Sequence, residues 1–369
     1  MSAEQMEIQV IAALTAAACA IPGVFLVLRR MAMMSDAISH SILLGIVMAF
    51  FVAGDVASPL LIIGAALSGV LTVSLVELLA KTGLVKEDAA IGLVFPLLFS
   101  IGVILIARYT WSVHLDVHMV LLGELAFAPF DRIVVDGVDI GPKSMYVMGT
   151  ILVLNLAFVL FMYKELKLAT FDAGLAAALG FAPGLIHYLL MGLVSVTAVG
   201  AFDAVGSILV VALMIAPPAA AYLLTDKLSR MLGLSVLIGV VSAIAGFWFA
   251  ILIDASIAGS MASAAGAAFL LVFLFAPERG LIAVYSRKSH QKREFAGRML
   301  VIHLLNHEGT PEEERESEVS HLEESLGWKK DFVKSVTGYS LRTGMVLVKK
   351  GRLKLTEKGR EFAGRSITE

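Results

Sequence analysis

Three absences limit what this sequence encodes. Its single cysteine, Cys19, lies inside a hydrophobic run, which excludes an intrachain disulfide and a cysteine metal cluster. Only 16% of the residues are charged, against about 25% in soluble domains, and the net charge of −2 indicates no polyanionic partner. The motifs Gly-x4-Gly-Lys-Ser/Thr, His-Glu-x-x-His and Gly-x-Ser-x-Gly do not occur, so the chain carries no recognisable ATPase motor or hydrolase site.

Hydrophobic residues, by contrast, make up 58% of the chain, and the mean hydropathy of +0.86 identifies an integral membrane protein. A membrane-spanning helix needs about 20 apolar residues. We expect spans at 8–28, 37–53, 58–80, 89–107, 145–162, 183–201, 203–224, 231–253 and 260–276, with a short break at 200–203. The predicted fold class is therefore an all-α polytopic membrane protein with about nine transmembrane helices.

Basic residues predict how the chain is oriented in the membrane. They gather in alternate loops, which by the positive-inside rule are cytoplasmic. This places the N-terminus outside and the C-terminus in the cytoplasm, and it requires an odd number of spans. The residues concerned are Arg29, Arg30, Lys81, Lys86, Lys164, Lys167, Lys227, Arg230, Arg279, Arg287 and Lys288.

Two polar residues stand at the start of the second span, in Met34-Ser-Asp-Ala-Ile-Ser-His40. The i,i+4 spacing of Asp36 and His40 puts both side chains on one helix face. Because charged groups are costly in lipid, they are expected to face a polar pathway or each other. Carboxylate and imidazole together suit a borderline divalent metal ion. The alternative is a pair of interfacial residues that cap the helix near the cytoplasm.

Further metal ligands are candidates along the outer part of the same pathway. His114, Asp116 and His118 alternate in an external loop, where they would attract metal or simply cap helix ends. Asp203 lies in the predicted break between two spans, where it would line the pathway or serve as a helix N-cap.

The cytoplasmic segment 164–182 is long and half apolar. Asp172 is suited to cap a short helix, and Gly180 is suited to end it. A short helix at the membrane face favours docking into a groove of another protein; the alternative is an amphipathic helix on the membrane surface without a partner.

Four separate stretches, 28–45, 86–92, 171–180 and 204–217, together resemble a known family: the integral-membrane permeases of ABC importers for zinc, manganese or iron. The resemblance covers about residues 10–276. It implies a permease fold of the type II importer kind, with Asp36 and His40 as the transport site. It also implies that Phe171, Asp172, Ala176 and Gly180 belong to a coupling helix that sits on a separate ATP-binding subunit.

The resemblance further implies the other partners and the cargo. An extracytoplasmic binding protein delivers the ion, the permease pairs with a second copy or a paralogue in the lipid of a bacterial inner membrane, and no cofactor is bound permanently. Two features depart from the family: Leu44 stands where Pro is common, and Pro218-Ala-Ala-Ala221 replaces Ala-Ala-Thr-Ala. The stretches 113–131 and 217–226 are closest to the manganese and iron branch.

The chain divides by composition into a membrane domain, 1–280, and a charged cytoplasmic domain, 281–369. Predicted helices at 319–326 and 331–341, a hairpin at 345–355 and a helix capped by Thr356 resemble the winged helix of metal-dependent repressors. A basic wing would meet phosphates, but a regulatory or assembly role is the favoured interpretation and DNA is not an expected partner. The wing residues are Arg342, Lys349, Lys350, Arg352 and Lys354.

Together these patterns predict the membrane subunit of an ATP-driven importer of divalent metal ions, first manganese and then iron or zinc. The chain itself is not expected to be an enzyme. Two other hypotheses remain: a secondary metal transporter in which Asp36 carries protons, and a membrane-tethered metal sensor that signals through 281–369.

Overall fold

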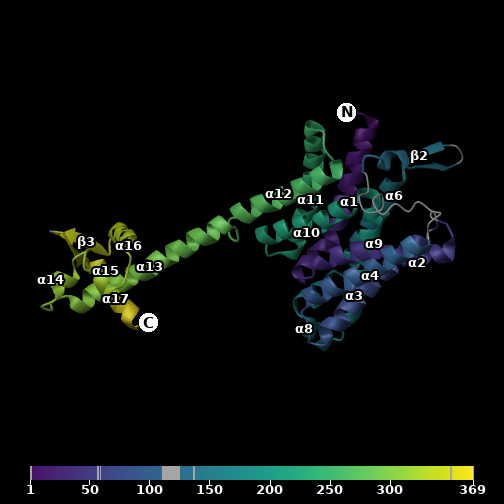
Figure 1. The fold of residues 1–369 in the computed structure, drawn as a ribbon. Coiled ribbons are helices and arrows are strands. Elements are labelled where there is room, and N and C mark those ends of the chain that lie inside the picture. The colour runs from purple at the N-terminus through teal and green to yellow at the C-terminus, as the bar shows by residue number, and fades with distance from the viewer. Residues whose placement is uncertain are drawn as a thin grey trace. The chain divides into compact units, whose positions relative to one another are not determined.

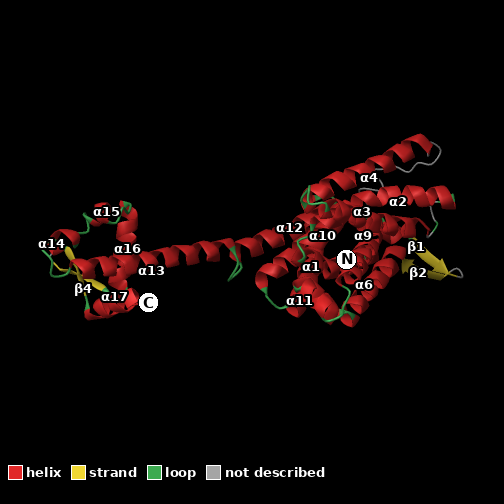
Figure 2. Cartoon of the chain, turned by 90° about the horizontal axis from the view of Figure 1, so that it is seen from below, coloured by secondary structure: helices red, strands yellow, loops and turns green. Residues whose placement is uncertain are grey.

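A computed structural model of the chain describes residues 2–55, 58, 60–109, 125–135, 138–349 and 351–368. Within these residues nine helices are long and apolar enough to cross a membrane, which confirms the predicted number. Strand occurs in this part of the chain only as two antiparallel hairpins (Figure 2). The fold divides into two compact units at Pro277 and Glu278, and each is described separately.

The nine long helices belong to the first unit, together with two short helices, a 3₁₀ turn and a hairpin. They are α1 Ala3–Leu28, α2 Met33–Ala53, α3 Leu60–Lys81, α4 Glu87–Tyr109, η1 Ala128–Phe130, β1 Arg132–Val135, β2 Val138–Pro142, α6 Lys143–Phe161, α7 Tyr163–Phe171, α8 Ala173–Ala178, α9 Pro183–Val205, α10 Ser207–Leu224, α11 Leu228–Ile253 and α12 Ile257–Phe275.

The expected break at 200–203 is wrong. Helix α9 continues to Val205, and the chain turns at Gly206, whose φ of 83° favours glycine. Asp203 therefore lies exposed in the last turn of α9 and is not an N-cap. The short polar interruption in the sequence was a poorer marker of the helix end than the glycine three residues later.

Helix α1 is the centre of the first unit. It packs against α6, α9, α10 and α11, while α2 packs against α3 and α4. Its central position explains why small residues such as alanine are frequent in α1, because small residues allow neighbouring helices to approach closely. Asn155 of α6 strengthens this centre: its buried amide donates to the Ala18 carbonyl at 2.8 Å and to Thr197 of α9 at 3.0 Å.

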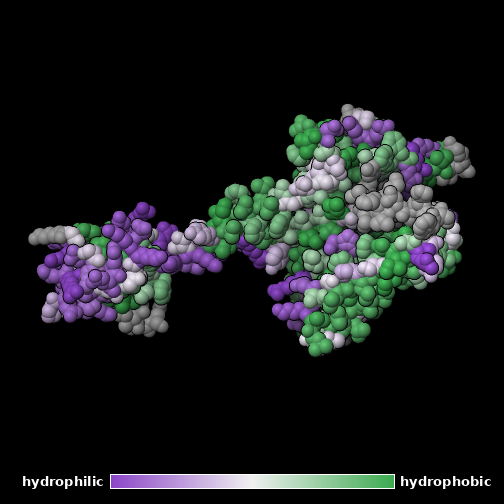
Figure 3. All heavy atoms as spheres, viewed as in Figure 1, coloured by the Kyte–Doolittle hydropathy of each residue, from purple (hydrophilic) through white to green (hydrophobic). Residues whose placement is uncertain are grey.

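The β1–β2 hairpin lies at the same end of this unit as the N-terminus, and α8 lies at the opposite end (Figure 1). Arg132 ties the hairpin to α1, since its guanidinium donates to Glu7 at 3.0 Å and also contacts Asp139. These two hydrogen-bonded carboxylates raise the pKa of Arg132. The remaining surface of the unit is mainly hydrophobic on the face that Figure 3 shows, as a lipid-facing surface must be.

Gly45 marks the closest approach of α2 to α3. A Cβ atom there would lie 2.2 Å from the Gly64 carbonyl oxygen and 2.6 Å from Ser68 Cβ. Gly45→Ala is therefore expected to destabilise the protein by about 1–3 kcal/mol, the usual cost of overpacking. The matched control is Gly266→Ala, because a Cβ at Gly266 meets nothing within 4 Å. Thermal unfolding of the two detergent-purified variants tests this; equal midpoints would contradict the packing argument.

The second unit consists of five helices and a hairpin around its own small core. These elements are α13 Leu281–His307, α14 Glu313–Glu316, α15 Leu322–Ser325, α16 Lys330–Arg342, β3 Val346–Lys349, β4 Arg352–Leu355 and α17 Glu357–Thr368. Its surface is mainly hydrophilic on the face drawn in Figure 3. A hydrogen-bonded ion pair joins α13 to α17: Arg360 donates to Glu308 at 2.7 Å and lowers the pKa of that carboxyl group.

The sequence predicted some of these elements better than others. The helix at 331–341, the hairpin at 345–355 and the cap are confirmed: Thr356 Oγ1 accepts from the Gly359 amide at 3.1 Å. The predicted helix at 319–326 is too long, because only Leu322–Ser325 is helical. Helix α13 was not predicted, since its amphipathic pattern is weak.

Candidate transport site and coupling surface

Asp36 and His40 lie together near the start of α2, as their spacing predicted. His40 Nε2 is 3.4 Å from Asp36 Oδ1, and each side chain is 32% exposed. Both groups are therefore desolvated only in part, which leaves room for an ion with some of its water. Of the two surroundings expected from the sequence, a polar pathway or each other, the structure shows the two side chains in contact with each other. This contact does not exclude metal binding, because the same two atoms are the potential ligands.

Two aromatic rings of α4 flank the pair. The ring of His40 stacks at 5.8 Å on Phe95 and meets Phe99 edge-on at 6.0 Å. These contacts pack the imidazole against α4. One turn further along α2, Leu44 begins an apolar groove of about 730 Å³ between α2, α3 and α4. The polar pair thus stands at one end of an otherwise hydrophobic surface.

A buried polar seam behind the pair holds α2 to α3. The Ser68 hydroxyl donates to the Ser41 carbonyl at 2.7 Å, and the Thr72 hydroxyl donates to Ser41 Oγ at 2.6 Å. All three residues are almost completely buried. The seam was not predicted, because isolated hydroxyls in apolar segments carry no periodic signal and usually bond to their own helix.

A chain of polar contacts crosses the helix ends near α7. The Arg29 guanidinium, just beyond α1, donates to Thr170 Oγ1 of α7 at 3.2 Å and to His187 Nδ1 of α9 at 3.2 Å. The other ring nitrogen of His187 lies against Glu77 of α3, which also pairs with Lys81 at 3.2 Å. Burial lowers the pKa of Arg29. The i,i+4 spacing accounts for the Glu77–Lys81 pair, whereas the extension to Arg29 joins segments far apart in the chain.

The short helix α8 presents an exposed apolar face. Asp172 Oδ1 accepts from the Leu175 amide at 2.9 Å and so caps the helix, and Gly180 with φ of 87° ends it, as predicted. Leu175 and Leu179 are 47% and 61% exposed, and Phe171 before the cap is 61% exposed. Ala176 is fully buried, so it supports α8 from beneath and cannot be a contact residue on its outer face.

His114, Asp116 and His118 lie outside the described residues, so the structure does not place them. Asp203 is the only other ligand candidate from the sequence, and it stands at the end of α9. Within the residues that are described, the one group of three metal-ligating side chains is His303, His307 and Glu316 of the second unit. No sequence motif indicated this group, because a turn separates Glu316 of α14 from the two histidines of α13.

The described part of the chain contains nine helices of membrane length. One of them carries a partly exposed carboxylate–imidazole pair, and a short helix with exposed leucines lies at one end. These are the features of a polytopic membrane transport protein. Comparison with known families gives the particular class. The ABC 3 transport family matches residues 3–276, and this chain belongs to it.

Similar proteins agree with this assignment. The chain is 50% identical over 284 residues to the manganese transport system membrane protein MntD of Bacillus subtilis, covering 77% of this chain and 96% of that protein. It is 46% identical over 358 residues to the zinc transport system membrane protein TroD of Treponema pallidum, covering 97% of each. The match to TroD therefore extends through the second unit.

A solved structure also matches the membrane unit. PsaBC from Streptococcus pneumoniae, in complex with Fab, has a TM-score of 0.63 at 28% identity and covers 76% of this chain and 94% of that chain. The predicted fold class is thereby confirmed for the membrane unit. The likeness of the C-terminal unit to a winged helix stays a prediction.

Proposed function

We propose that this permease is the membrane subunit of an ATP-driven importer of divalent transition metal ions, with manganese as first substrate and iron or zinc next. The observation that carries the proposal is the Asp36–His40 pair on a membrane-length helix, in a chain similar to membrane proteins of manganese and zinc transport systems. ATP hydrolysis belongs to a separate ATP-binding subunit, in agreement with the lack of a Walker A motif.

The pair suits transient binding. One carboxylate and one imidazole supply only part of the coordination shell of an ion, and a transport site must release what it binds. Imidazole favours manganese, iron and zinc over magnesium, which prefers oxygen ligands and loses water reluctantly. Asp203, and His114, Asp116 and His118 in the external loop, are proposed to attract the ion before it reaches the pair.

The orientation follows from the loop charges: the N-terminus is outside, and α8 and the second unit are in the cytoplasm. An extracytoplasmic binding protein then delivers the ion to the end that carries the hairpin, and the ATP-binding subunit docks on α8. A second permease, either a copy or a paralogue, completes the pathway in the inner membrane.

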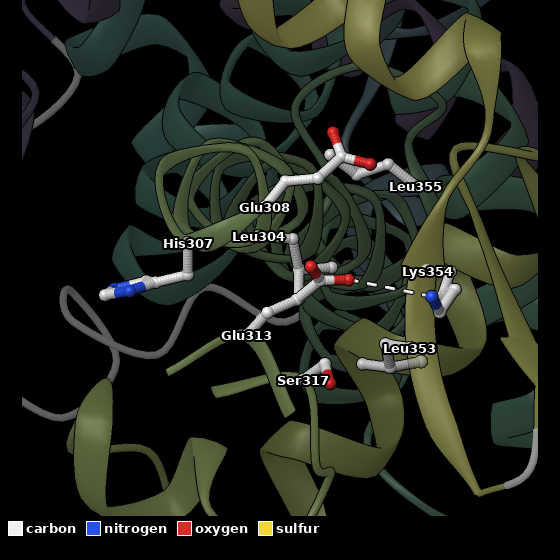
Figure 4. A pocket seen from close by; sticks show the side chains of 8 residues that line it. All are labelled: Leu304, His307, Glu308, Glu313, Ser317, Leu353, Lys354 and Leu355. Carbon is white, nitrogen blue, oxygen red and sulfur yellow. Dashed lines mark ion pairs between the residues drawn. The ribbon is translucent and has the colours of Figure 1, made fainter. Parts of the chain in front are cut away.

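DNA is not part of this proposal. Two of the basic wing residues are already paired with acidic ones, since Arg352 Nη1 lies 2.8 Å from Glu314 and Lys354 Nζ lies 3.6 Å from Glu313. Figure 4 shows Glu313 and Lys354 facing each other across a small cleft. Lys350 is outside the described residues. These pairs reduce the positive charge that a phosphate backbone would meet and favour an assembly or regulatory role.

The test of the proposal is the energy source of manganese uptake. In cells that express this permease with its ATP-binding subunit, uptake of radiolabelled manganese is expected to stop when the Walker A lysine of that subunit is replaced, and to persist during brief treatment with an uncoupler while ATP is maintained. The reverse result would identify the secondary transporter instead. The absence of uptake with both subunits intact would favour the membrane-tethered sensor.

A further inference from the structure

The second unit brings together two histidines and a glutamate from different elements. His303 and His307 lie one turn apart at the end of α13, and Glu316 ends α14. One ligand atom from each lies within 4.8 Å of the others, and all three residues are half-buried. The i,i+4 spacing places both imidazoles on one face of α13, toward the chain that returns from the turn.

Glu316 is held in place by its other neighbours. Ser325 Oγ donates to Glu316 Oε2 at 2.8 Å, and His321 Nε2 lies 3.1 Å from Glu316 Oε1. A metal ligand that is oriented by hydrogen bonds from outside the site is the usual arrangement, because it fixes the carboxylate before the ion binds. His321 and Ser325 therefore orient the same carboxylate group, that of Glu316, that lies next to His303.

His303 has an imidazole nitrogen that its surroundings do not satisfy. His303 Nε2 is buried and 3.2 Å from Glu316 Oε2, yet the orientation of the two groups makes no hydrogen bond, and no other described residue supplies one. A buried nitrogen without a partner is costly unless an ion or a solvent molecule binds it. That nitrogen lies beside Glu316, within the group that His307 completes.

The acidic turn before Glu316 adds selectivity for a cation. Glu313 and Glu314 are committed to Lys354 and Arg352 of β4, so they anchor the turn to the hairpin. Figure 4 shows the Glu313–Lys354 pair beside the end of α13, where His307 also lies. Glu312 Oε2, by contrast, is 3.8 Å from His307 Nδ1 and adds negative charge next to the imidazoles.

We propose that His303, His307 and Glu316 form a binding site for a divalent transition metal ion in the C-terminal unit, separate from the transport pair. Two imidazoles and one carboxylate are the ligands of many zinc and iron(II) sites and are poor ligands for magnesium or calcium. Ligand atoms of a tetrahedral zinc site are about 3.3 Å apart, for bonds of about 2.0 Å. Small side-chain rotations close the present separations to that value.

Binding would link the end of α13 to the hairpin. Glu316 lies two residues after Glu314, the second of the two glutamates that pair with β4, and the Leu353 amide donates to the Ser317 carbonyl at 2.9 Å. An ion that pulls Glu316 toward α13 therefore also constrains β4. This inference does not rest on the transport function, because it requires only that the ion bind.

The experiment measures cobalt and zinc binding to the full chain in lipid nanodiscs. Cobalt reports nitrogen ligation through its visible absorption bands, and zinc is then titrated in competition. All variants carry Asp36→Ala and His40→Ala, so that the transport pair does not contribute. We expect this background protein to bind cobalt with nitrogen-type bands, to release it to zinc, and to retain it in excess magnesium.

Substitution then assigns the ligands. His307→Gln or Glu316→Gln is expected to weaken zinc binding at this site by about 100-fold or more, at least as much as loss of an outer-shell partner. His303→Gln should do the same, and the first two variants carry the test if this half-buried residue proves necessary for folding. The matched control, His290→Gln, changes an exposed histidine of α13 that contacts Tyr339 and should leave binding unchanged.

Two results would overturn the proposal. One is a background protein that gives no nitrogen-type cobalt bands. The other is binding that survives His307→Gln and Glu316→Gln unchanged in monodisperse protein. Neither result bears on transport, because the ATP-dependence experiment uses the intact Asp36–His40 pair.

Discussion

Manganese uptake is expected to fall by about 100-fold or more when Asp36 is replaced by Asn and His40 by Gln together, because loss of an outer-shell partner alone costs a metal site 10–100-fold. Both substitutions keep the size and polarity of the side chain. They remove the fixed negative charge and the ring nitrogen that lie 3.4 Å apart on α2. The measurement is initial uptake of radiolabelled manganese in cells with the complete transporter.

The loss must come from the site and not from the fold. Helix α2 is also held to α3 by the Ser41, Ser68 and Thr72 seam, whose hydrogen bonds involve neither Asp36 nor His40. The double variant should therefore purify with its ATP-binding subunit in normal amounts. Met48→Leu, a change at an exposed residue of the same helix, is the control and should retain uptake. Full uptake in an assembled double variant would remove the proposed site.

The location of the pair could be predicted because it depends on local spacing. An i,i+4 relation on a helix is fixed by the helix itself, and hydropathy alone identified α2 as a helix. For the same reason the caps at Asp172 and Thr356 were predictable, since each involves an amide three residues further on.

What surrounds the pair could not be predicted, because it comes from segments far apart in the chain. The rings of Phe95 and Phe99 reach His40 from α4, and Thr170 meets Arg29 across 141 positions. Nothing in an apolar segment distinguishes a phenylalanine that faces lipid from one that stacks on an imidazole. The His303, His307 and Glu316 cluster was missed for a similar reason: its two elements meet only after the chain has turned.

Burial likewise distinguishes the residues of α8 that are exposed from those that face inward. The resemblance to importer permeases selected Ala176, yet its side chain faces inward and Leu175 and Leu179 face outward. A six-residue helix shows too little periodicity to reveal its exposed face from sequence alone.

Replacing Leu175 and Leu179 by Asp together is expected to abolish ATP-driven uptake while the permease still folds. Leu175 lies in α8 and Leu179 is its C-cap residue, and both are exposed, so two carboxylates there would be unpaired and desolvated in a complex docked on this helix. An interface of this kind loses several kcal/mol when buried charges lack partners, enough for a drop in affinity of at least about 100-fold. Copurification of the ATP-binding subunit with tagged permease measures the loss directly.

The control for this prediction is Val134→Asp in β1, which adds a charge at an equally exposed apolar residue at the opposite end of the unit. It should leave copurification of the ATP-binding subunit unchanged. The contact between Thr170 and Arg29 gives α7 a physical connection to His187 and Glu77, and through α3 to the seam that holds α2. Docking on α8, as proposed, would act through these contacts on the helix that bears the Asp36–His40 pair. Normal copurification of the Leu175→Asp, Leu179→Asp variant would show that the ATP-binding subunit binds another surface. The proposed connection from α8 to α2 would then lack its first contact.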